Sequence, residues 1–444
     1  MLEFIKKPLR PLFHKITPFY NLYHHSLGIL AATSFGFPSM KMRVIGITGT
    51  NGKTTTANLL AHILKSKGEK VGLATTVNVW DGSKKWTNET KMTTISPFAL
   101  QGLLRRMVKN KCTYAIVETT SHSLAQHRTW GIFYDIALFT NLTHDHLDYH
   151  KTFERYKEAK GLLFKNLADS LRKPKMPKMA IVNISDPNSD YFKSFTADKQ
   201  YFFGIDNLTT EVAPDTLVSA KNIRPAKDHT YFTLVTPQGS IDIKLKLPGK
   251  FNVYNALAAA STAYSLEIPL PTIQQGIESM WNLPGRMETV PNTKDFDIII
   301  DYAHTPDGFE QVFKELRKIA NNKIISVFGA TGNRDKSKRP ILGEIASKYA
   351  DVIILTEEDH GTESPEEIIK EILPGIDQDK FKKDQNLFII PDRKEALKKA
   401  LQTATSGDLV LSLALGGQTV IVRGDKKIPF DERKVIEELL KTMA

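Results

Sequence analysis

The chain has 444 residues, of which 41% are apolar and 25% are charged, and its formal net charge is +11. This length exceeds what one hydrophobic core supports, so we expect two or three domains of an ordinary globular protein. The single cysteine, Cys112, cannot form an internal disulfide, and no apolar run resembles a secretory signal or a membrane span, so we expect a cytoplasmic protein.

The positive charge is compatible with nucleic acid, an anionic membrane surface or acidic small molecules. Lysine and arginine are spread along the chain and form no single block with interleaved aromatic residues. We therefore expect nucleotides and other acidic small molecules as ligands, and no nucleic acid.

Residues 1–42 stand apart from the rest of the chain. The stretch Tyr20–Phe37 is apolar, contains histidine and has no charged residue, and four basic residues precede it. Such a segment either lies on a membrane as an amphipathic helix or packs as a helix on the body of the protein. We favour the packed helix and keep membrane contact as the alternative.

The segment Gly49–Thr55, with the sequence Gly-Thr-Asn-Gly-Lys-Thr-Thr, is typical of a phosphate-binding loop. It follows an apolar run at residues 44–48 and precedes a helical pattern. A glycine-rich turn between strand and helix directs backbone N–H groups and the positive end of the helix dipole at one anion. Lys53 is then placed to reach the terminal phosphates, and the Thr54 hydroxyl to hold Mg²⁺. One departure is Ile47, which occupies the position of the usual first glycine.

Apolar runs alternate with helical stretches from Arg43 to about residue 165, which predicts βαβ units and a parallel sheet. Residues 178–248 contain short alternating segments, and we interpret them as an antiparallel addition to the same domain. A helix is expected from about Val253 to Leu266. The first-domain strands are predicted at residues 44–48, 71–75, 114–118 and 135–140.

Pro284-Gly285 marks a linker, and the strand–helix alternation restarts after it. The fold class is therefore α/β, with a parallel-sheet ATPase domain at residues 43–283 and a smaller Rossmann-like α/β domain at residues 284–444. The strands of the second domain are predicted at residues 297–301, 324–328, 351–355 and 409–413.

Polar residues end several of these strands, where open parallel sheets gather their ligands. Glu118, Asn141 and Asp301 are the clearest examples. A carboxylate such as Glu118, near the Thr54 hydroxyl, suits the Mg²⁺ that accompanies a triphosphate. The alternative is that Glu118 caps a helix or lies at the surface.

The stretch His144–His150 is dense in imidazole and carboxylate groups. A zinc site is an alternative, but no cysteine supports it and the spacing fits no zinc motif. We favour one histidine that faces the nucleotide and structural roles for the others.

Lys160 lies in the middle of an apolar helix face that also contains Phe153, Tyr156, Leu163 and Phe164. A buried lysine is rare unless it is paired or its pKa falls. A neutral amine can react with carbon dioxide to give a carbamate that binds metal. From burial alone we favour the other interpretation, a lysine whose amine extends to solvent at the edge of the apolar face.

Together these motifs resemble the Mur ligase family, in the branch that adds the third residue of the peptidoglycan stem peptide. They occur in family order over residues 43 to about 345. The matching stretches are Gly49–Thr55, Glu118–Arg128, Asn141–His150, Tyr156–Lys160, Gly249–Asn255, Gly285–Glu288 and Asp301–Pro306.

The resemblance implies an ATP-dependent amide-bond ligase that uses two Mg²⁺ ions and a muramoyl-peptide substrate. ATP would phosphorylate a substrate carboxylate, and the amine of an amino acid would attack the acyl phosphate while a mobile last domain excludes water. The residues implied to bind ATP are Gly49, Thr50, Asn51, Gly52, Lys53, Thr54, Thr55, Asn255, Arg286 and Asp301.

The resemblance also implies metal ligands and catalytic groups. Thr54, Glu118, His146 and a carbamylated Lys160 would hold the metal ions, which reverses our preference for Lys160. Lys53, Lys160, His146 and Glu118 would carry the catalysis. Residues implied to contact the muramoyl peptide are Thr93, Thr94, Ser121, Gln126 and Arg128. Residues similar to the family's basic loop are Asn333, Arg334, Asp335, Lys338 and Arg339.

Two departures from the family concern the substrates. Only 42 residues precede the core, where a standard member has a domain that binds UDP, so a lipid-carried or shortened acceptor becomes an alternative. Members that add diaminopimelate carry Asp-Asn-Pro-Arg in the last domain, whereas Glu358–Gly361 here has no arginine. Their later Gly-Lys-Gly-His-Glu motif corresponds to Ala414–Gln418. We therefore predict that the added residue is not bound in the diaminopimelate manner.

Two other functions remain as alternatives. One is a related ligase of the folylpolyglutamate or polyglutamate type. The other is a nucleotide-binding scaffold subunit that has lost its amino-acid site. The motif around Thr120-Ser121-His122 favours the peptidoglycan branch, and the intact set of Lys53, Glu118, His146 and Lys160 argues against a scaffold.

Overall fold

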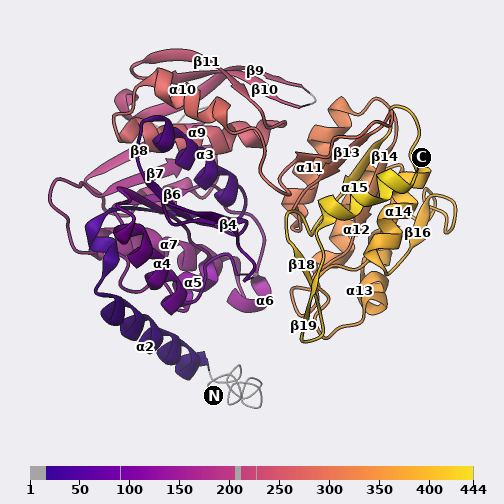
Figure 1. The fold of residues 1–444 in the computed structure, drawn as a ribbon, viewed down its shortest axis with the longest axis horizontal. Helices are drawn as coiled ribbons and strands as arrows, with labels where there is room; N and C mark the ends of the chain where they lie inside the picture. Colours follow the sequence, from indigo (N-terminus) through magenta and orange to yellow (C-terminus); the bar gives the residue numbers. More distant parts are fainter. Residues whose placement is uncertain (1–16, 91, 206–211, 227, 444) are drawn as a thin grey trace.

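The computed structural model describes residues 17–90, 92–205, 212–226 and 228–443. These residues form two α/β units, each built around its own sheet, and Figure 1 shows them side by side. The chain passes from one unit to the other between α10 (Leu270–Ser279) and β12 (Glu288–Thr289). The linker predicted at Pro284-Gly285 lies within this passage.

The first unit contains an eleven-stranded sheet in the described residues. Its centre is parallel and pairs β1 with β5 on one side and with β6 on the other. Across the sheet the order is β11 (Gly239–Leu245), β10 (Thr230–Thr236), β9 (Leu217–Pro225), β8 (Lys199–Gly204), β7 (Met179–Asn183), β6 (Ile136–Phe139), β1 (Arg43–Thr48), β5 (Tyr114–Glu118), β2 (Val71–Ala74), β3 (Asn78–Trp80) and β4 (Lys85–Thr87).

Helices cover both faces of this sheet, so its central strands are buried on both sides. Along β1, Ile45 and Ile47 belong to one core cluster and Val44 to the other, as the period of two in a strand requires. One face carries α3 (Lys53–Ser66), α9 (Lys250–Ser265) and α10; the other carries α4 (Pro97–Lys109), α5 (Ser121–Ala125), α7 (Phe153–Asp169) and α8 (Ser189–Lys193).

The prediction of an antiparallel addition at residues 178–248 is wrong for its first half. β7 and β8 pair in parallel with β6 and with each other, and β9 pairs in parallel with β8. Within residues 178–248, only β9, β10 and β11 are antiparallel neighbours; the antiparallel β3 and β4 lie at the other edge of the sheet. The five-residue helix α8 makes the crossover between β7 and β8, and it is too short to show a helical period in the sequence.

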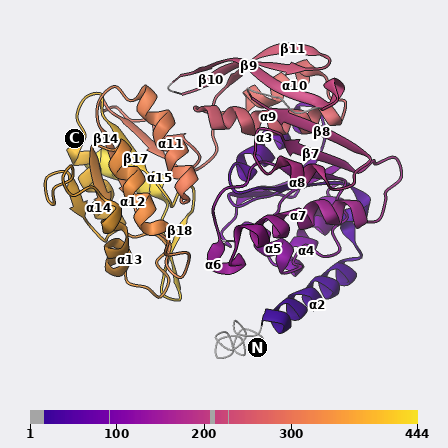
Figure 2. The ribbon, with the colours of Figure 1, turned by 180° about the vertical axis from the view of Figure 1, so that it is seen from behind.

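The second unit contains a six-stranded sheet in the described residues, parallel except for the antiparallel β12. Its order is β12, β13 (Asp297–Ile300), β17 (Leu409–Ser412), β14 (Ile324–Phe328), β15 (Val352–Leu355) and β16 (Leu387–Ile389). Figure 2 shows the unit from behind, with α11 (Pro306–Ile319), α12 (Lys338–Tyr349) and α13 (Pro365–Ile372) on one face. The other face carries α14 (Arg393–Thr403) and α15 (Glu432–Thr442).

The helix expected in the N-terminal segment is α2 (Thr17–Phe35), and it packs on α4 of the first unit. Gly28 allows α2 also to approach the turn after α5 closely, because a Cβ at Gly28 would lie 2.9 Å from the His127 carbonyl oxygen and 3.0 Å from Trp130 Cβ. The preferred packed helix is therefore confirmed for residues 17–35. Residues 1–16, with the four basic side chains, lie outside the described residues. No helix among the described residues is long and apolar enough to cross a bilayer.

Candidate active site

A cavity of about 540 Å³ lies between the two units. The first unit contributes the loop at Gly49–Thr55, and the second contributes residues that follow β13, β14 and β15. The cavity thus lies at the carboxyl ends of strands of both sheets, the usual place for ligands in open parallel sheets.

The predicted phosphate-binding loop connects β1 to α3 and has the glycines that its backbone requires. Gly49 and Gly52 have φ values of +149° and +82°. A Cβ at Gly52 would lie 2.1 Å from the Asn255 side-chain oxygen, and one at Gly49 would lie 1.9 Å from the Thr140 hydroxyl. Asn255 therefore packs directly on the loop, beside the N-terminus of α3.

The Lys53 amine folds back over the loop. Its Nζ donates to the backbone oxygens of Gly49 at 3.0 Å and of Thr50 at 2.8 Å. Burial lowers the pKa of Lys53, and the nearby Glu118 carboxylate opposes the shift. These contacts hold the amine over the loop, at the mouth of the cavity.

Glu118 ends β5 and meets the start of α3. The Thr54 hydroxyl donates to its Oε2 at 2.9 Å, and the Thr76 backbone N–H donates to the same oxygen at 2.8 Å. Glu118 is buried, so its interpretation as a surface residue is wrong. A hydroxyl beside a carboxylate offers the oxygen ligands that Mg²⁺ prefers, so the residues present fit the ion. No group of three or more histidine, cysteine or acidic side chains is arranged around a metal position in the described part of the chain.

Lys160 on α7 is 2% exposed, and its Nζ donates to the Gly49 backbone oxygen at 2.7 Å. The interpretation that its amine extends to solvent is therefore wrong. The Lys53 amine donates to the same oxygen. Burial lowers the pKa of Lys160 well below its usual range, and the charge of Lys53 acts in the same direction. The ring of Tyr156 lies 4.4 Å from the Lys160 amine.

His146 is the histidine of the His144–His150 stretch that lines the cavity. Its Nε2 lies 3.2 Å from Asp145 Oδ2, and burial lowers its pKa. His122 and His150 pack behind it, and burial lowers their pKa values to about 2 and about 4. The cluster is thus neutral near pH 7, the form in which imidazole binds metal.

The second unit brings Arg286 and Asp301 to the cavity. An Arg286 guanidinium nitrogen lies 3.5 Å from the Thr54 hydroxyl, and the guanidinium stacks on Tyr302. Asp301 accepts the backbone N–H groups of Met287 and Ala303, and burial raises its pKa. These bonds orient the turn that carries Arg286.

Asp307 also reaches the first unit, because its Oδ2 accepts from the Asn51 side chain at 2.7 Å. It lies at the N-terminus of α11, where the sequence analysis assigned no role. Its position directly after the motif Asp301–Pro306 was the available signal.

The five residues implied to contact the muramoyl peptide occupy two layers. Thr93 and Ser121 line the cavity, whereas Thr94, Gln126 and Arg128 do not. Thr94 donates to the Glu118 backbone oxygen at 3.0 Å, and Arg128 donates to the Thr94 backbone oxygen at 2.8 Å. Gln126 donates to the Tyr149 hydroxyl. Thr94 and Arg128 thus support the end of β5 from behind the cavity wall.

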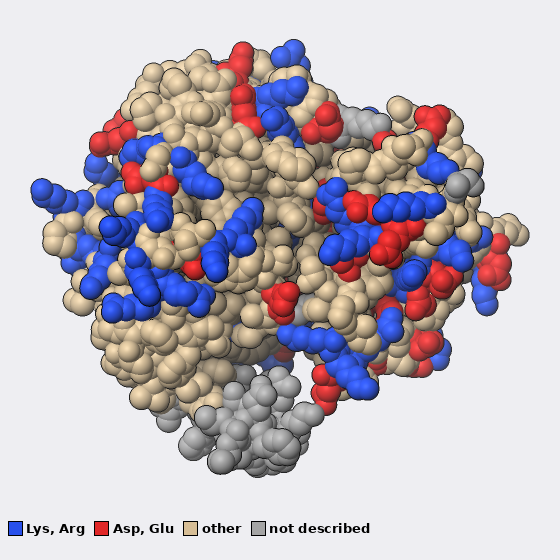
Figure 3. Space-filling model, in the orientation of Figure 1, with Lys and Arg blue, Asp and Glu red and all other residues tan. Residues whose placement is uncertain are grey.

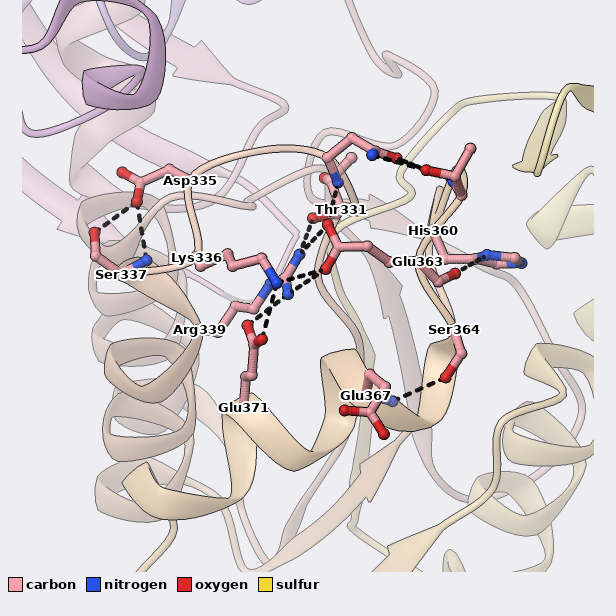
Figure 4. Close-up of polar contacts among 12 residues, drawn as sticks. Thr331, Asp335, Lys336, Ser337, Arg339, His360, Glu363, Ser364, Glu367 and Glu371 are labelled. Atoms are coloured by element: carbon pink, nitrogen blue, oxygen red, sulfur yellow. Dashed lines mark hydrogen bonds and ion pairs between the residues drawn. The ribbon is translucent and has the colours of Figure 1, made fainter.

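In the basic loop before α12, too, some residues line the cavity and others do not. Arg334, Asp335 and Lys338 line the cavity. Arg339 instead lies fully buried beneath the loop, where it binds the carboxylates of Glu363 at 2.9 Å and Glu371 at 2.6 Å (Figure 4). Asn333 turns away from the cavity and donates to the Thr362 hydroxyl.

Two acidic residues follow β15 and line the cavity, Glu358 and Asp359. Glu358 is 4% exposed; the Thr331 hydroxyl donates to its Oε1, and its Oε2 has no hydrogen-bond partner among the described residues. Burial and the neighbouring Asp359 raise the pKa of Glu358. A buried oxygen without a partner, facing a cavity, is a candidate contact for a ligand.

Comparison with known proteins decides the family. A model of the Mur ligase middle domain matches residues 47–263, and a model of the Mur ligase glutamate ligase domain matches residues 285–416. The chain belongs to the Mur ligase family. It is an ATP-dependent acid–amino-acid ligase of peptidoglycan precursor synthesis, as the motifs predicted.

Relatives of this Mur ligase are named as ligases of UDP-N-acetylmuramoyl peptides. The UDP-N-acetylmuramoyl-L-alanyl-D-glutamate–2,6-diaminopimelate ligase 1 of Clostridium acetobutylicum is 39% identical over 421 residues, which cover 94% of this chain and 82% of the relative. The UDP-N-acetylmuramyl-tripeptide synthetase of Roseiflexus is 38% identical over 423 residues, with 93% and 82% covered.

Among solved structures, a UDP-N-acetylmuramoyl-L-alanyl-D-glutamate–2,6-diaminopimelate ligase is 30% identical, with a TM-score of 0.60 over 90% of this chain and 79% of that one. A folylpolyglutamate synthase from Mycobacterium tuberculosis has a TM-score of 0.68 over 90% and 95%, but only 16% identity, so the two share a fold. The scaffold and folylpolyglutamate alternatives therefore give way to the peptidoglycan branch.

Proposed function

We propose that this Mur ligase phosphorylates the free carboxylate of a muramoyl-dipeptide with ATP and joins a diamino acid to it through an acyl phosphate. The relatives' names include the acceptor UDP-N-acetylmuramoyl-L-alanyl-D-glutamate, and we take it as the acceptor here. The core at residues 43–283 binds ATP and acceptor in this proposal, and residues 284–444 close over them.

One observation carries the proposal: Lys53 and Lys160 donate to the same backbone oxygen of Gly49. The ammonium groups of buried Lys160 and half-buried Lys53 repel each other at this distance, and no carboxylate lies within ion-pair distance of Lys160 among the described residues. A carbamate on Lys160 removes the conflict, because it turns one cation into an anion that pairs with the other.

The carbamate also completes a set of anionic and neutral ligands for two Mg²⁺ ions. Thr54 and Glu118 hold one ion in this proposal, and His146 with carbamylated Lys160 holds the other. When bound, the ions supply positive charge that allows a triphosphate and a carboxylate to approach. Lys53 and Arg286 add fixed cations at the same place, so the developing charge on the transferred phosphoryl group is stabilised.

The incoming amino acid lies toward the second unit in this proposal. Arg334 offers a guanidinium for its α-carboxylate, and Glu358 and Asp359 offer carboxylates for an ammonium group. The relatives' names specify diaminopimelate, which has two amines and two carboxylates. Gly361 has no side chain that could hold the second carboxylate. This agrees with the prediction that the added residue is not bound in the diaminopimelate manner, and that statement stays a prediction.

The role of Lys160 is tested by ATP turnover with acceptor and amino acid present. We expect Lys160→Ala to lose at least about 100-fold in kcat, because metal and phosphate lose a ligand. Small carboxylates such as formate should restore part of it by replacing the carbamate. Lys165→Ala, at an exposed position on the same helix, should be unaffected. An active Lys160→Ala enzyme would contradict the proposal.

The amino-acid site is tested by ADP release with meso-diaminopimelate, lysine, ornithine and alanine in turn. We expect turnover with diamino acids and little with alanine, since alanine leaves the buried Glu358 Oε2 without a partner. Strong selectivity for meso-diaminopimelate would reject the predicted difference in binding mode, and equal turnover with alanine would reject the diamino-acid site.

The role of Glu358 is tested by substitution. Glu358→Gln should raise KM for the preferred diamino acid about 10-fold, and the exposed control Glu366→Gln should not.

A further inference from the structure

The outer face of α2 is unusual for a helix at the surface of a soluble protein. Tyr23, Ser26, Ile29, Leu30 and Thr33 are exposed along it, and the whole helix contains no lysine, arginine or acidic residue. Leu30 alone is 55% exposed. Surface helices ordinarily place charged residues on the side that faces water, so this face fits a less polar environment.

The apolar surface continues onto α4. A Cβ at Gly102 would lie 3.3 Å from the Phe35 ring, so the two helices touch there. Phe98, 43% exposed, precedes Gly102 by one helical turn, and Arg105 follows it by nearly one turn. The face of α4 beside α2 therefore contains an exposed aromatic ring followed by a cation.

A basic surface borders this apolar face. Arg106 of α4 lies over the exposed Trp86 ring of β4, with 5.4 Å between guanidinium carbon and centroid. Lys84 and Lys109 line the same shallow groove as Trp86. Lys84, Arg105 and Lys109 form no ion pair within the described residues. Tryptophan beside unpaired cations is typical of surfaces that meet lipid headgroups.

The part of the sequence that contains β4 and α4 is strongly basic, although its basic residues also include Lys53 of the active-site loop and lysines of α3 on the other face of the sheet. Residues 41–111 contain 13 lysine and arginine residues and only 3 acidic ones, so they account for ten of the eleven net positive charges. Residues 112–444 are close to neutral. Figure 3 shows lysine and arginine gathered at the left of the first unit, above the uncharged region where Figure 1 places α2.

We propose that the face formed by α2, α4 and β4 docks the enzyme on an anionic phospholipid bilayer. Ile29, Leu30 and Phe98 enter the headgroup region, and Lys84, Arg105 and Lys109 contact lipid phosphates. None of these residues lines the active-site cavity, so docking leaves the cavity accessible. An apolar helix face argues for lipid over nucleic acid, which offers no apolar phase to accept it.

Co-sedimentation of the full chain with vesicles tests this proposal. We expect binding to vesicles of equal parts phosphatidylcholine and phosphatidylglycerol, at least about 10-fold weaker binding to phosphatidylcholine alone, and loss of binding as salt screens the cations. The combined substitutions Lys84→Gln, Arg105→Gln and Lys109→Gln should reduce binding at least about 10-fold. The pair Ile29→Ser and Leu30→Ser should reduce it as well.

A matched control removes three exposed lysines from the second unit, with Lys348→Gln, Lys370→Gln and Lys398→Gln. This variant should bind vesicles like the unchanged protein, and all variants should retain their melting temperature and their ATP turnover in solution. The proposal is overturned if the protein does not sediment with anionic vesicles, or if the control loses as much binding as the docking-face variant. Binding to a DNA duplex that competes with vesicles and ignores the serine substitutions would also overturn it, in favour of nucleic acid.

Discussion

The buried lysine and arginine side chains of this protein differ in whether a carboxylate lies beside them. Lys173 lies against Asp135 at 2.6 Å, and Arg393 lies against Glu432 at 3.1 Å, each pair with side chains almost inaccessible to solvent. These cations have carboxylate partners, as buried charges require. Lys160 has only a backbone oxygen and a tyrosine ring in the described residues. Lys160 therefore differs from the paired cations in its surroundings, which supports the reactive role that we propose for it.

Arg339 provides a test of pairing at this scale. We expect Arg339→Met to lower the free energy of unfolding by about 2 kcal/mol at pH 7, since Glu363 and Glu371 lose their shared partner. Lys336, exposed beside the same two acids, is the control, and Lys336→Met should cost less than about 0.5 kcal/mol. Denaturant melts provide both values.

The effect of Arg339→Met should depend on pH. The hydrogen bond from Arg339 is the main reason that the pKa of Glu363 falls from 4.5 to about 2. A carboxyl group with a lowered pKa stabilises the folded state above its ordinary pKa, and this stabilisation is lost as the pH falls toward the folded value. The stability difference between the protein and the variant should therefore shrink between pH 4.5 and pH 2. A constant difference over that range would contradict the assignment.

At the scale of elements, the passage between the two units depends on one glycine. Gly285 has a φ of +63°, and a Cβ there would lie 1.7 Å from the Gly417 backbone nitrogen. We expect Gly285→Ala to cost about 2–3 kcal/mol and to lower activity, because the backbone must shift and Arg286 moves with it. Thermal melts and ATP turnover measure the two effects.

Gly424 is a matched control for this substitution. Its φ is +61°, but a Cβ there meets nothing within 4 Å. Gly424→Ala should therefore show only the conformational cost of about 1 kcal/mol, with activity retained. Equal losses for both variants would mean that backbone strain alone, and no contact with Gly417, explains the glycine at 285.

For the whole molecule, few polar contacts join the two units. The described examples include Asn51 with Asp307, His144 with Asp335 at 3.7 Å, and the Lys427 amine with the Glu89 backbone oxygen at 3.2 Å. An interface held by scattered polar contacts around a cavity suits units that separate to exchange ligands.

Asp307→Ala tests this view of the interface. The variant loses a charge-assisted hydrogen bond to the phosphate-binding loop, so we expect kcat/KM for ATP to fall about 10-fold with an unchanged melting temperature. Small-angle scattering should show a larger radius of gyration than for the exposed control Asp379→Ala. A compact variant with normal kinetics would show that Asp307 does not hold the units together.

The sequence alone predicted the features that depend on neighbouring residues. β1, β5 and β6 were predicted to within one residue at each end, because buried parallel strands are continuous apolar runs. The segment Gly49–Thr55 was predicted as a phosphate-binding loop because its glycines and lysine are adjacent in the chain. The parallel pairing of β7 and β8 was missed, since their crossover carries only a five-residue helix.

Only the tertiary structure decided which distant side chains meet. Lys160 reaches Gly49 across 111 residues, and Asn51 reaches Asp307 across 256. The sequence also could not separate Thr93 and Ser121, which line the cavity, from Thr94 and Arg128 behind them. Periodicity records which face of an element is apolar, whereas the order of strands in the sheets determines which faces lie opposite. The motifs of this ligase can therefore be identified in its sequence. Which of their side chains meet in one site depends on the order of strands in its two sheets and on how the two sheets are placed.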